Sequence, residues 1–368
     1  MSYYILPKIN NIINVNPMSI CDDILKPYTS HSLYQYYNQM REEIDKNISK
    51  ENDGITNNYD ELIKIINPYE YIFSKVPGSK FSVSKLKPKT NIFYDFLEVS
   101  TTINIFESHK DQNIKTLHLT PNYSDTIECF EMLRENFKDD ITYYDSINEE
   151  NMKSIEDTKF NFLFLEVNHS NFKNYITNLI ECVMLIFRNQ ESDGSCIIKI
   201  NHVFHKPVVD ILYLLSSLYD KVYVLKPNTS NVTSFDKYIV CKNFQKNESK
   251  LIYFKCSYYR LLVFLKKIEN KNIISILDFD IPNYFLTKID DMNIIIGQQQ
   301  LESVDIIINI LKNKNKDDKI ETIKKSNIQK AISWCEKYKI PCNRFSEKIN
   351  IFLPINNEIK EIIDIENL

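Results

Sequence analysis

Glycine is scarce in this chain: there are four glycines among 368 residues, and none lies between Gly78 and Gly194. Glycine lets a backbone approach a phosphate or a nucleotide closely. The sequence has no GxxxxGK[ST] phosphate loop, and the HExxH and GxSxG motifs are missing too. P-loop NTPase, zinc protease and α/β-hydrolase activities are therefore poor interpretations of this sequence.

Paired cysteines and long apolar runs are also lacking. The eight cysteines are scattered without a CxxC pair, which argues against structural zinc and disulfides and favours a reducing compartment. His202 and His205 are three residues apart, but no third metal ligand stands near them. No apolar run is long enough to span a membrane, and the N-terminus does not resemble a secretory signal. We expect a cytoplasmic protein with no membrane span and no metal.

What the sequence does contain is an alternation of strand-like and helix-like segments. The expected strands are 91–99, 114–120, 140–145, 160–167, 195–200, 221–227 and 237–244. Helix-length segments between most of them predict parallel βαβ units and a Rossmann-like, doubly wound, mostly parallel sheet. Only the polar loop 228–236 separates the last two strands, so one edge of the sheet is expected to be antiparallel.

The two ends of the chain have a different pattern. Residues 1–60 are polar and predict a helix followed by a loop that ends near Gly54. After about residue 245, helix-like segments joined by polar linkers predominate. We expect an N-terminal helical and loop segment (1–60), an α/β domain (61–249) and a mainly helical C-terminal region (250–368).

The turn that follows the first expected strand is a candidate cofactor site, because this is where a glycine-rich loop meets the ligand in such folds. Here the turn reads "EVSTT" and has no glycine. The cofactor-binding candidates in this turn and at the ends of the next two strands are Glu98, Val99, Ser100, Thr101, Thr102, Thr120 and Asp145.

A basic cluster precedes this strand. It contains Lys75, Lys80, Lys85, Lys87 and Lys89, with no acidic residue between Glu70 and Asp95. Because the net charge of the chain is −4, any contact with nucleic acid must come from a local patch of this kind. The lysines could bind phosphates; the alternative is a solvated lysine-rich loop.

Three charged residues stand at the ends of later strands. Glu166 ends one apolar strand, Lys199 lies near the end of the next, and Asp236 precedes the last. Each has an ordinary interpretation, as a capping acid, a snorkelling lysine and a turn residue. Together with Lys85 they could line one cleft, where carboxylates orient two lysines and one lysine deprotonates a weakly acidic hydroxyl.

The stretch "GSCIIKI…LYDKVYVLKPNTSNVTSFDKYIVCKNF" resembles the FtsJ-like (RrmJ-type) ribose 2′-O-methyltransferases, particularly those of large DNA viruses. Residues 78–86 and "NIQKAISWCEKYKIP" are more weakly similar. The resemblance implies a methyltransferase-like fold, S-adenosylmethionine as cofactor and an RNA 2′-hydroxyl as nucleophile, often at an mRNA cap. It also implies an infected-cell cytoplasm or a virion as the location.

The family carries a Lys-Asp-Lys-Glu tetrad. Matched residue by residue, the resemblance implies Lys85, Glu166, Lys199 as the base, and Asp236, with both carboxylates changed in length. The family's acid-Ala-Pro-Gly-Gly-like cofactor loop would correspond to "EVSTT", whose β-branched threonines tolerate positive φ poorly.

Two functions therefore stay open. One is an RNA 2′-O-methyltransferase that acts on the mRNA cap and whose lysines at 75, 80, 87 and 89 hold RNA. The other is an inactive relative that binds RNA or stimulates a viral capping, polyadenylation or transcription complex. An α/β domain unrelated to methylation is a third interpretation.

Overall fold

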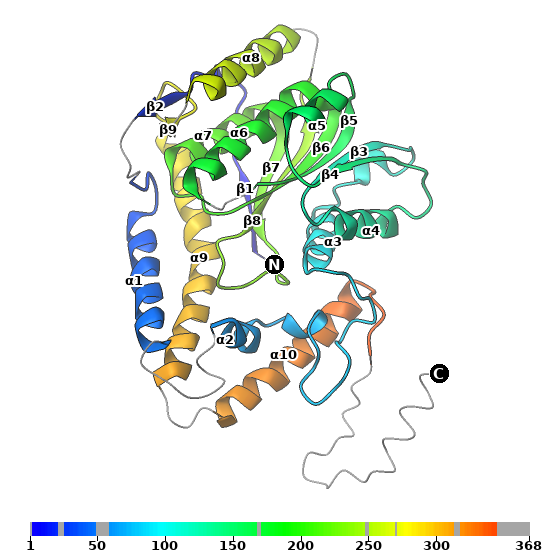
Figure 1. Ribbon diagram of the computed structural model, residues 1–368, viewed down its shortest axis with the longest axis vertical. Coiled ribbons are helices and arrows are strands. Elements are labelled where there is room, and N and C mark those ends of the chain that lie inside the picture. The colour runs from blue at the N-terminus through cyan, green and yellow to red at the C-terminus, as the bar shows by residue number, and fades with distance from the viewer. Residues whose placement is uncertain are drawn as a thin grey trace.

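The computed structural model describes residues 2–20, 26–48, 59–167, 171–246, 250–268, 271–312 and 317–343. A seven-stranded sheet forms its centre (Figure 1). The strands of this sheet are β1 (Ser2–Leu6), β3 (Lys115–Leu119), β4 (Asp140–Tyr144), β5 (Phe160–Glu166), β6 (Gln190–Ile200), β7 (Tyr219–Lys226) and β8 (Lys237–Phe244). Their order across the sheet is β4-β3-β5-β6-β8-β7-β1.

Strands β4, β3, β5 and β6 are parallel, whereas β8 runs antiparallel to both of its neighbours. The expected doubly wound, mostly parallel sheet is thus confirmed. The antiparallel strand β8 lies inside the sheet, however, and the edge is formed by β1, which pairs antiparallel with β7. No local pattern predicts this edge strand, because its partner is more than 200 residues away.

Helices cover both faces of the sheet (Figure 1). One face packs against α6 (Phe172–Asn189) and α7 (Lys206–Leu218), and the other against α3 (Ile92–Ile103) and α4 (Tyr123–Leu133). The short α5 (Glu149–Ser154) lies within the charged segment that precedes β5. Each face carries its own cluster of buried apolar side chains.

The expected strand at 91–99 is wrong, because residues 92–99 belong to α3 and Asn91 is its N-cap. A short, continuously apolar run is equally compatible with a buried strand and a buried helix. In α3 the apolar side chains point to all sides, since the helix is buried along most of its length. Asn104 ends the helix in the left-handed region, at φ 49°. The helix expected at 102–111 is reduced to the end of α3 and one 3-10 turn, η3 (Glu107–His109).

The C-terminal region is mainly helical, as expected. It contains α8 (Leu251–Lys267), α9 (Asn283–Lys312) and α10 (Asp317–Lys337), plus the short strand β9 (Asn272–Ser275). The loop expected near Gly54 and residues 344–368 lie outside the described residues. None of the helices that the structure describes is long and apolar enough to cross a membrane.

The N-terminal residues interleave with this region. Strand β2 (Met18–Ile20) pairs with β9, and α1 (His31–Ile48) runs beside α9 (Figure 1). The two helices pack closely at Gly297, where a Cβ atom would lie 2.8 Å from Leu33 Cδ2. Helix α10 contacts α2 (Tyr59–Ile66) and the 3-10 turn η2 (Glu70–Ile72), and α2 also contacts α9.

The helical assignment of α3 can be tested with Thr101→Ala. Thr101 is exposed on α3, and alanine is the better helix former, so the free energy of unfolding should rise by up to about 0.7 kcal/mol. The matched control is Thr142→Ala in strand β4, which should lower it by up to about 1 kcal/mol. Urea unfolding measures both, and a destabilised Thr101→Ala variant would contradict a helix here.

Candidate functional site at the carboxyl edge of the sheet

Glu166 and Lys199 form an ion pair across two parallel strands. They are register partners at the ends of β5 and β6, and Lys199 Nζ lies 2.8 Å from Glu166 Oε1. Lys199 is in turn the register partner of Tyr238 on β8. Register partners project to the same face of a sheet, so this row of side chains faces α3. The exposed fractions of the Lys199 and Glu166 side chains are 18% and 14%, so the pair remains accessible.

The electrostatic surroundings keep Lys199 protonated. Burial by itself would lower the pKa of Lys199, but the negative charges of Glu166, Asp236 and Asp95 outweigh it and raise the pKa above its ordinary value. As arranged here, Lys199 is an ammonium donor to Glu166. It can act as a base only if the surroundings lose negative charge or gain positive charge.

Asp236 lies beside this pair, at the end of the loop that joins β7 and β8. Its Oδ1 accepts a hydrogen bond from Asn201 Nδ2 at 3.4 Å. Lys226 Nζ donates to the carbonyl oxygens of Ser234 at 2.6 Å and Asp236 at 3.3 Å, which ties down the end of the loop. Burial lowers the pKa of Lys226 to about 8, although Asp236 and Asp95 act in the opposite direction.

Lys85 is not joined to these three residues. Its side chain is exposed, and none of the hydrogen bonds or ion pairs among the described residues connects it to Glu166, Lys199 or Asp236. Its backbone N–H donates to Pro341 O at 2.8 Å, close to the end of the described chain. The structure therefore brings three of the four expected catalytic residues into one neighbourhood, and their catalytic roles stay predictions.

Asp95 of α3 is a site residue that the sequence reasoning missed. Its Oδ2 accepts a hydrogen bond from Tyr238 OH at 3.0 Å, and its Oδ1 accepts one from Thr229 Oγ1 at 2.5 Å. Burial raises the pKa of this carboxyl, although its hydrogen bonds and Lys199 oppose the shift. An acid inside an apolar run was the available signal, because a buried carboxyl requires partners.

Glu98 lies one helical turn from Asp95 and is fully buried. Its Oε2 accepts hydrogen bonds from Asn228 N at 2.9 Å, Thr229 N at 3.4 Å and Trp334 Nε1 at 3.3 Å. Glu98 Oε1 has no hydrogen-bond partner among the described residues. Burial raises the pKa of Glu98, and nearby Asp95 adds to this. Glu98 thus clamps the loop after β7 to α3 and α10.

The cofactor role of Glu98–Thr102 was expected because these residues were predicted to form a turn after the first strand. They lie inside a helix instead, so this reason for the role no longer applies. Val99 and Ser100 are buried in α3, whereas Thr101 and Thr102 are exposed on it. The first strand–turn–helix of the parallel sheet is instead β3, residues 120–122 and α4. Thr120, an expected cofactor residue, is the first residue of this turn, and the turn contains no glycine either.

The turn after β3 is held by hydrogen bonds between its own residues. Asn122 N donates to Thr120 Oγ1, and Tyr123 N donates to Thr120 O, both at 3.1 Å. The Thr120 hydroxyl donates in turn to Glu166 Oε2. None of residues 120–124 has a positive φ. The backbone N–H groups that would approach a nucleotide at such a turn therefore already have partners within it.

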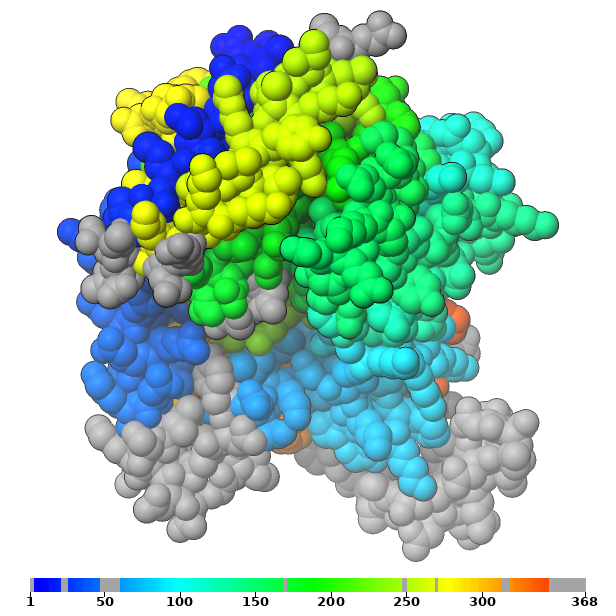
Figure 2. Space-filling model, turned by 45° about the horizontal axis from the view of Figure 1, so that its top comes forward, coloured from blue at the N-terminus to red at the C-terminus, as the bar shows by residue number. Residues whose placement is uncertain are grey.

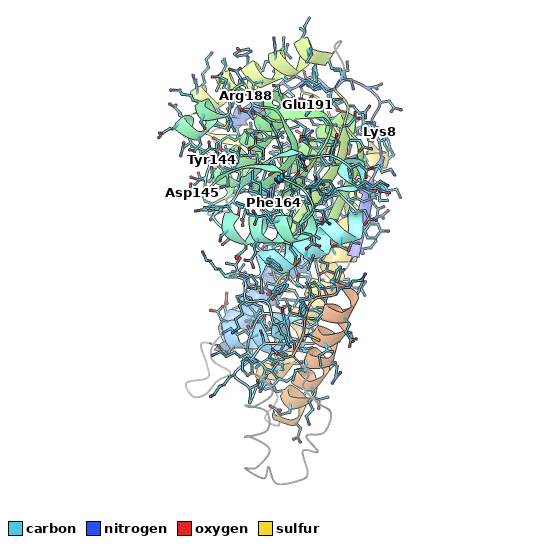
Figure 3. All side chains as sticks on the ribbon, turned by 90° about the vertical axis from the view of Figure 1, so that its right-hand side faces the viewer. Lys8, Tyr144, Asp145, Phe164, Arg188 and Glu191 are labelled. Carbon is cyan, nitrogen blue, oxygen red and sulfur yellow. The ribbon has the colours of Figure 1, made fainter. Side chains whose placement is uncertain are left out.

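Asp145 occupies the more favourable position for a cofactor. It directly follows β4 at the carboxyl edge, is exposed, and lies with Tyr144 at the margin of the sheet (Figure 3). An acid near this edge can bind ribose hydroxyls of a nucleoside. Asp145 alone does not form a cofactor site, however. The neighbouring turn at 120–122 would have to complete the site, and this turn does not fit S-adenosylmethionine. Among the described residues no group of histidine, cysteine and acidic side chains could hold a metal ion.

The basic cluster lies close to this turn. Asp125, in the first turn of α4, accepts hydrogen bonds from Lys89 N at 2.9 Å and Thr90 Oγ1 at 2.5 Å. All five lysines are exposed, and none of them is in an ion pair with a described residue. The five are Lys75, Lys80, Lys85, Lys87 and Lys89. Asp125 thereby fixes the C-terminal end of the cluster next to the β3–α4 turn.

Comparison with known proteins gives a distant relationship over part of the chain. No family model matches it. Over 121 residues it is 26% identical to the cap-specific mRNA (nucleoside-2′-O-)-methyltransferase 1 of Leishmania braziliensis, covering 32% of this chain and 29% of that protein. Over 130 residues it is 29% identical to an uncharacterized protein of Acanthamoeba polyphaga mimivirus, covering 35% and 34%. The chain thus spans about a third of each relative, and within that stretch it is homologous to an RNA 2′-O-methyltransferase.

Two solved structures of methyltransferases are also similar. A ribosomal RNA methyltransferase from Plasmodium falciparum matches with a TM-score of 0.33 and 14% identity, over 43% of this chain and all of that one. A Haemonchus contortus N-methyltransferase matches with a TM-score of 0.25 and 14% identity, over 42% and 41%. At these scores the two matches add nothing to the fold described above.

The clamp at Glu98 predicts a pH-dependent effect of Glu98→Gln. An acid whose pKa is raised in the folded chain stabilises the fold fully below its ordinary pKa of about 4.3. That contribution is lost as the pH rises through the folded pKa. The neutral amide keeps its contribution, so the stability of the variant relative to the parent should increase as the pH rises above this ordinary pKa. Unfolding in urea at a series of pH values measures the effect.

The control is the same change at exposed Glu107, outside the clamp, which should not reproduce the effect. Glu98→Ala, which also removes three hydrogen bonds, should destabilise the chain at every pH by about 2–4 kcal/mol. If the stability of Glu98→Gln relative to the parent instead decreased as the pH rises, this would show that the carboxyl is ionised in the folded chain.

Proposed function

We propose that this chain is a methyltransferase-like RNA-binding protein that does not itself use S-adenosylmethionine. The observation that carries the proposal is the turn after β3, whose N–H groups at Asn122 and Tyr123 are bonded to Thr120. A cofactor with a nucleoside and an amino-acid part needs backbone at this turn to come close to it. At Asn122 and Tyr123 this turn has no free N–H for the cofactor.

The rest of the edge supports this reading. Both carboxylate oxygens of Glu166 are engaged, one by Lys199 and the other by Thr120. The raised pKa of Lys199 keeps it protonated, because burial is outweighed by three nearby carboxylates. Proton abstraction from a ribose hydroxyl needs a neutral amine. The interactions among Glu166, Lys199 and Thr120 thus form a network that stabilises the structure of this edge.

RNA binding rests on the basic cluster and on the homologous relative. The exposed lysines carry positive charge without acidic neighbours in the chain between Glu70 and Asp95. Asp125 holds the backbone of one of them, Lys89, next to the carboxyl edge. The relative from Leishmania braziliensis is a cap-specific mRNA methyltransferase. This chain would bind RNA at the corresponding edge, as a subunit of a capping, polyadenylation or transcription complex.

Calorimetric titration with S-adenosylmethionine and S-adenosylhomocysteine tests the cofactor part. We expect no binding heat from either ligand up to about 1 mM, which corresponds to a binding free energy weaker than about −4 kcal/mol. Adenosine alone is the control for a residual nucleoside contact at Asp145. Saturable binding of either cofactor at micromolar concentration would refute the proposal.

RNA binding is tested separately, with the double variant Lys87→Ala/Lys89→Ala. If both lysines contact phosphates of single-stranded RNA, the slope of log K against log salt should fall by roughly 1.4. The control double variant, Lys110→Ala/Lys138→Ala, removes the same charge before β3 and β4, at the opposite edge of the sheet. Fluorescence anisotropy with a labelled oligonucleotide measures both, and equal losses in the two variants would contradict a specific RNA surface.

An active RNA 2′-O-methyltransferase, acting on capped mRNA, is the second candidate function. The ion pair between Lys199 and Glu166 favours it, because a lysine held by carboxylates at this edge can accept the proton of a ribose hydroxyl once its pKa is lowered. S-adenosylmethionine would supply the methyl group when bound.

Methyl transfer to capped RNA decides between the two functions. An active chain should lose transfer in Lys199→Ala, by at least a hundredfold as expected for a general base. Lys110→Ala, an exposed lysine outside the site, should keep it. Our proposal expects no transfer from the parent chain, and robust transfer that depends on Lys199 would establish the second candidate instead.

A further inference from the structure

Helix α8 lies on the outer surface of the molecule, against α6 (Figures 1 and 2). Its inner face is fully packed. Phe254 is 2% exposed and Leu261 is buried, and the Phe254 ring centroid lies 5.7 Å from that of Phe187. This inner face accounts for the attachment of α8 to the α/β domain.

The outer face of α8 is also apolar. Ile252, Tyr259 and Val263 have exposed fractions of 75%, 60% and 47%, and Cys256 is exposed between them. Their spacing of four, three and four residues is that of the a and d positions in a heptad. At 100° per residue they fall within a stripe about 60° wide. A helix that is apolar on two opposite faces is normally covered on both.

Basic side chains flank this stripe on both sides. They are Lys255, Arg260, Lys266 and Lys267, and α8 has no acidic residue. None of the four is in an ion pair within the part of the chain that the structure describes. The helix is thus strongly cationic, although the whole chain has a net charge of −4.

We propose that the outer stripe of α8 binds an amphipathic helix of a partner protein, with apolar residues at its own a and d positions and acidic residues beside them. Ile252, Cys256, Tyr259 and Val263 would form the apolar seam, and the flanking basic residues would pair with the partner's acids. This inference is independent of the proposed RNA-binding function, because α8 is on the face of the sheet opposite to α3 and the Glu166–Lys199 row.

Charge and shape favour this occupant over two others. A second copy of α8 would bring cationic flanks against cationic flanks, in either orientation of the two helices. A membrane surface would be bound by a broad apolar face, whereas a narrow a/d stripe is typical of a helix–helix seam.

The helix is held in place before any partner binds. Tyr253 OH donates to Ile13 O, and Arg260 Nη1 donates to Val15 O at 3.3 Å, so the N-terminal segment runs along α8. Tyr258 OH accepts a hydrogen bond from Arg188 Nη1 at 3.1 Å. A preorganised helix loses little conformational freedom on binding. The stripe is therefore a rigid docking surface.

The test uses the full chain and two synthetic helical peptides of about three heptads. Both peptides have leucine and isoleucine at a and d; one has glutamate at the flanking e and g positions and the other has lysine. We expect the chain to bind the glutamate peptide at least tenfold more tightly than the lysine peptide, less so at high salt. Fluorescence anisotropy with labelled peptides measures the affinities.

Two variants and a matched control locate the binding. Tyr259→Asp should weaken binding of the glutamate peptide at least tenfold, as expected for an aromatic residue at the centre of a seam. Ile294→Asp, at a similarly exposed apolar position on α9, should leave it unchanged. The double charge reversal Lys255→Glu/Lys266→Glu should shift the preference toward the lysine peptide, a result that a folding defect cannot produce.

Each other outcome would overturn the proposal. Equal affinity for the two peptides, or none for either, would exclude a cationic helix-binding seam. A concentration-dependent dimer in sedimentation that Tyr259→Asp dissolves would assign the stripe to self-association. Tight binding to vesicles of anionic phospholipid, lost in the same variant and not competed by the glutamate peptide, would assign it to a membrane surface.

Discussion

Two buried acidic side chains on α3 determine how the candidate site is arranged at the edge of the sheet where the parallel strands end. Asp95 and Glu98 lie one turn apart on α3, where the sheet and α10 exclude water. A buried carboxyl is costly unless it is hydrogen-bonded. Its partners here come from β8, from the loop after β7 and from Trp334 of α10. The same loop ends at Asp236, so the helix, the loop and the candidate site have a common support.

Periodicity in the sequence was sufficient for β3 to β8, because strands buried on both faces alternate there with helices of the right length. It failed at 91–99, where a run of nine mostly apolar residues fits a helix and a strand equally well. That error moved the cofactor turn one element too early. Strand β1 was missed for a different reason: five residues carry little local signal, and what makes them a strand is β7.

In the candidate site, too, the residues that local sequence patterns indicate were predictable, and those placed by contacts distant in the sequence were not. Glu166 and Lys199 were predictable, since charged residues at the ends of apolar parallel strands must meet at one edge. The position of Lys85 depends on how the chain crosses from α2 to α3 and on its pairing with 341–343, which no local pattern encodes. The hydrogen bond from Thr120 to Glu166 depends on a turn that had not been recognised as one.

The pairing of the chain's first strand has a consequence for synthesis on the ribosome. Residues Ser2–Leu6 join the sheet only beside Tyr219–Lys226, and Met18–Ile20 only beside Asn272–Ser275. At about 5–20 residues per second, the first segment therefore waits roughly 10–45 seconds for its partner to emerge. During that interval Ile9, Ile13 and Val15, which are buried in the finished fold, lack the core that covers them. The nascent chain should thus depend on chaperones at its N-terminal end more than at its centre.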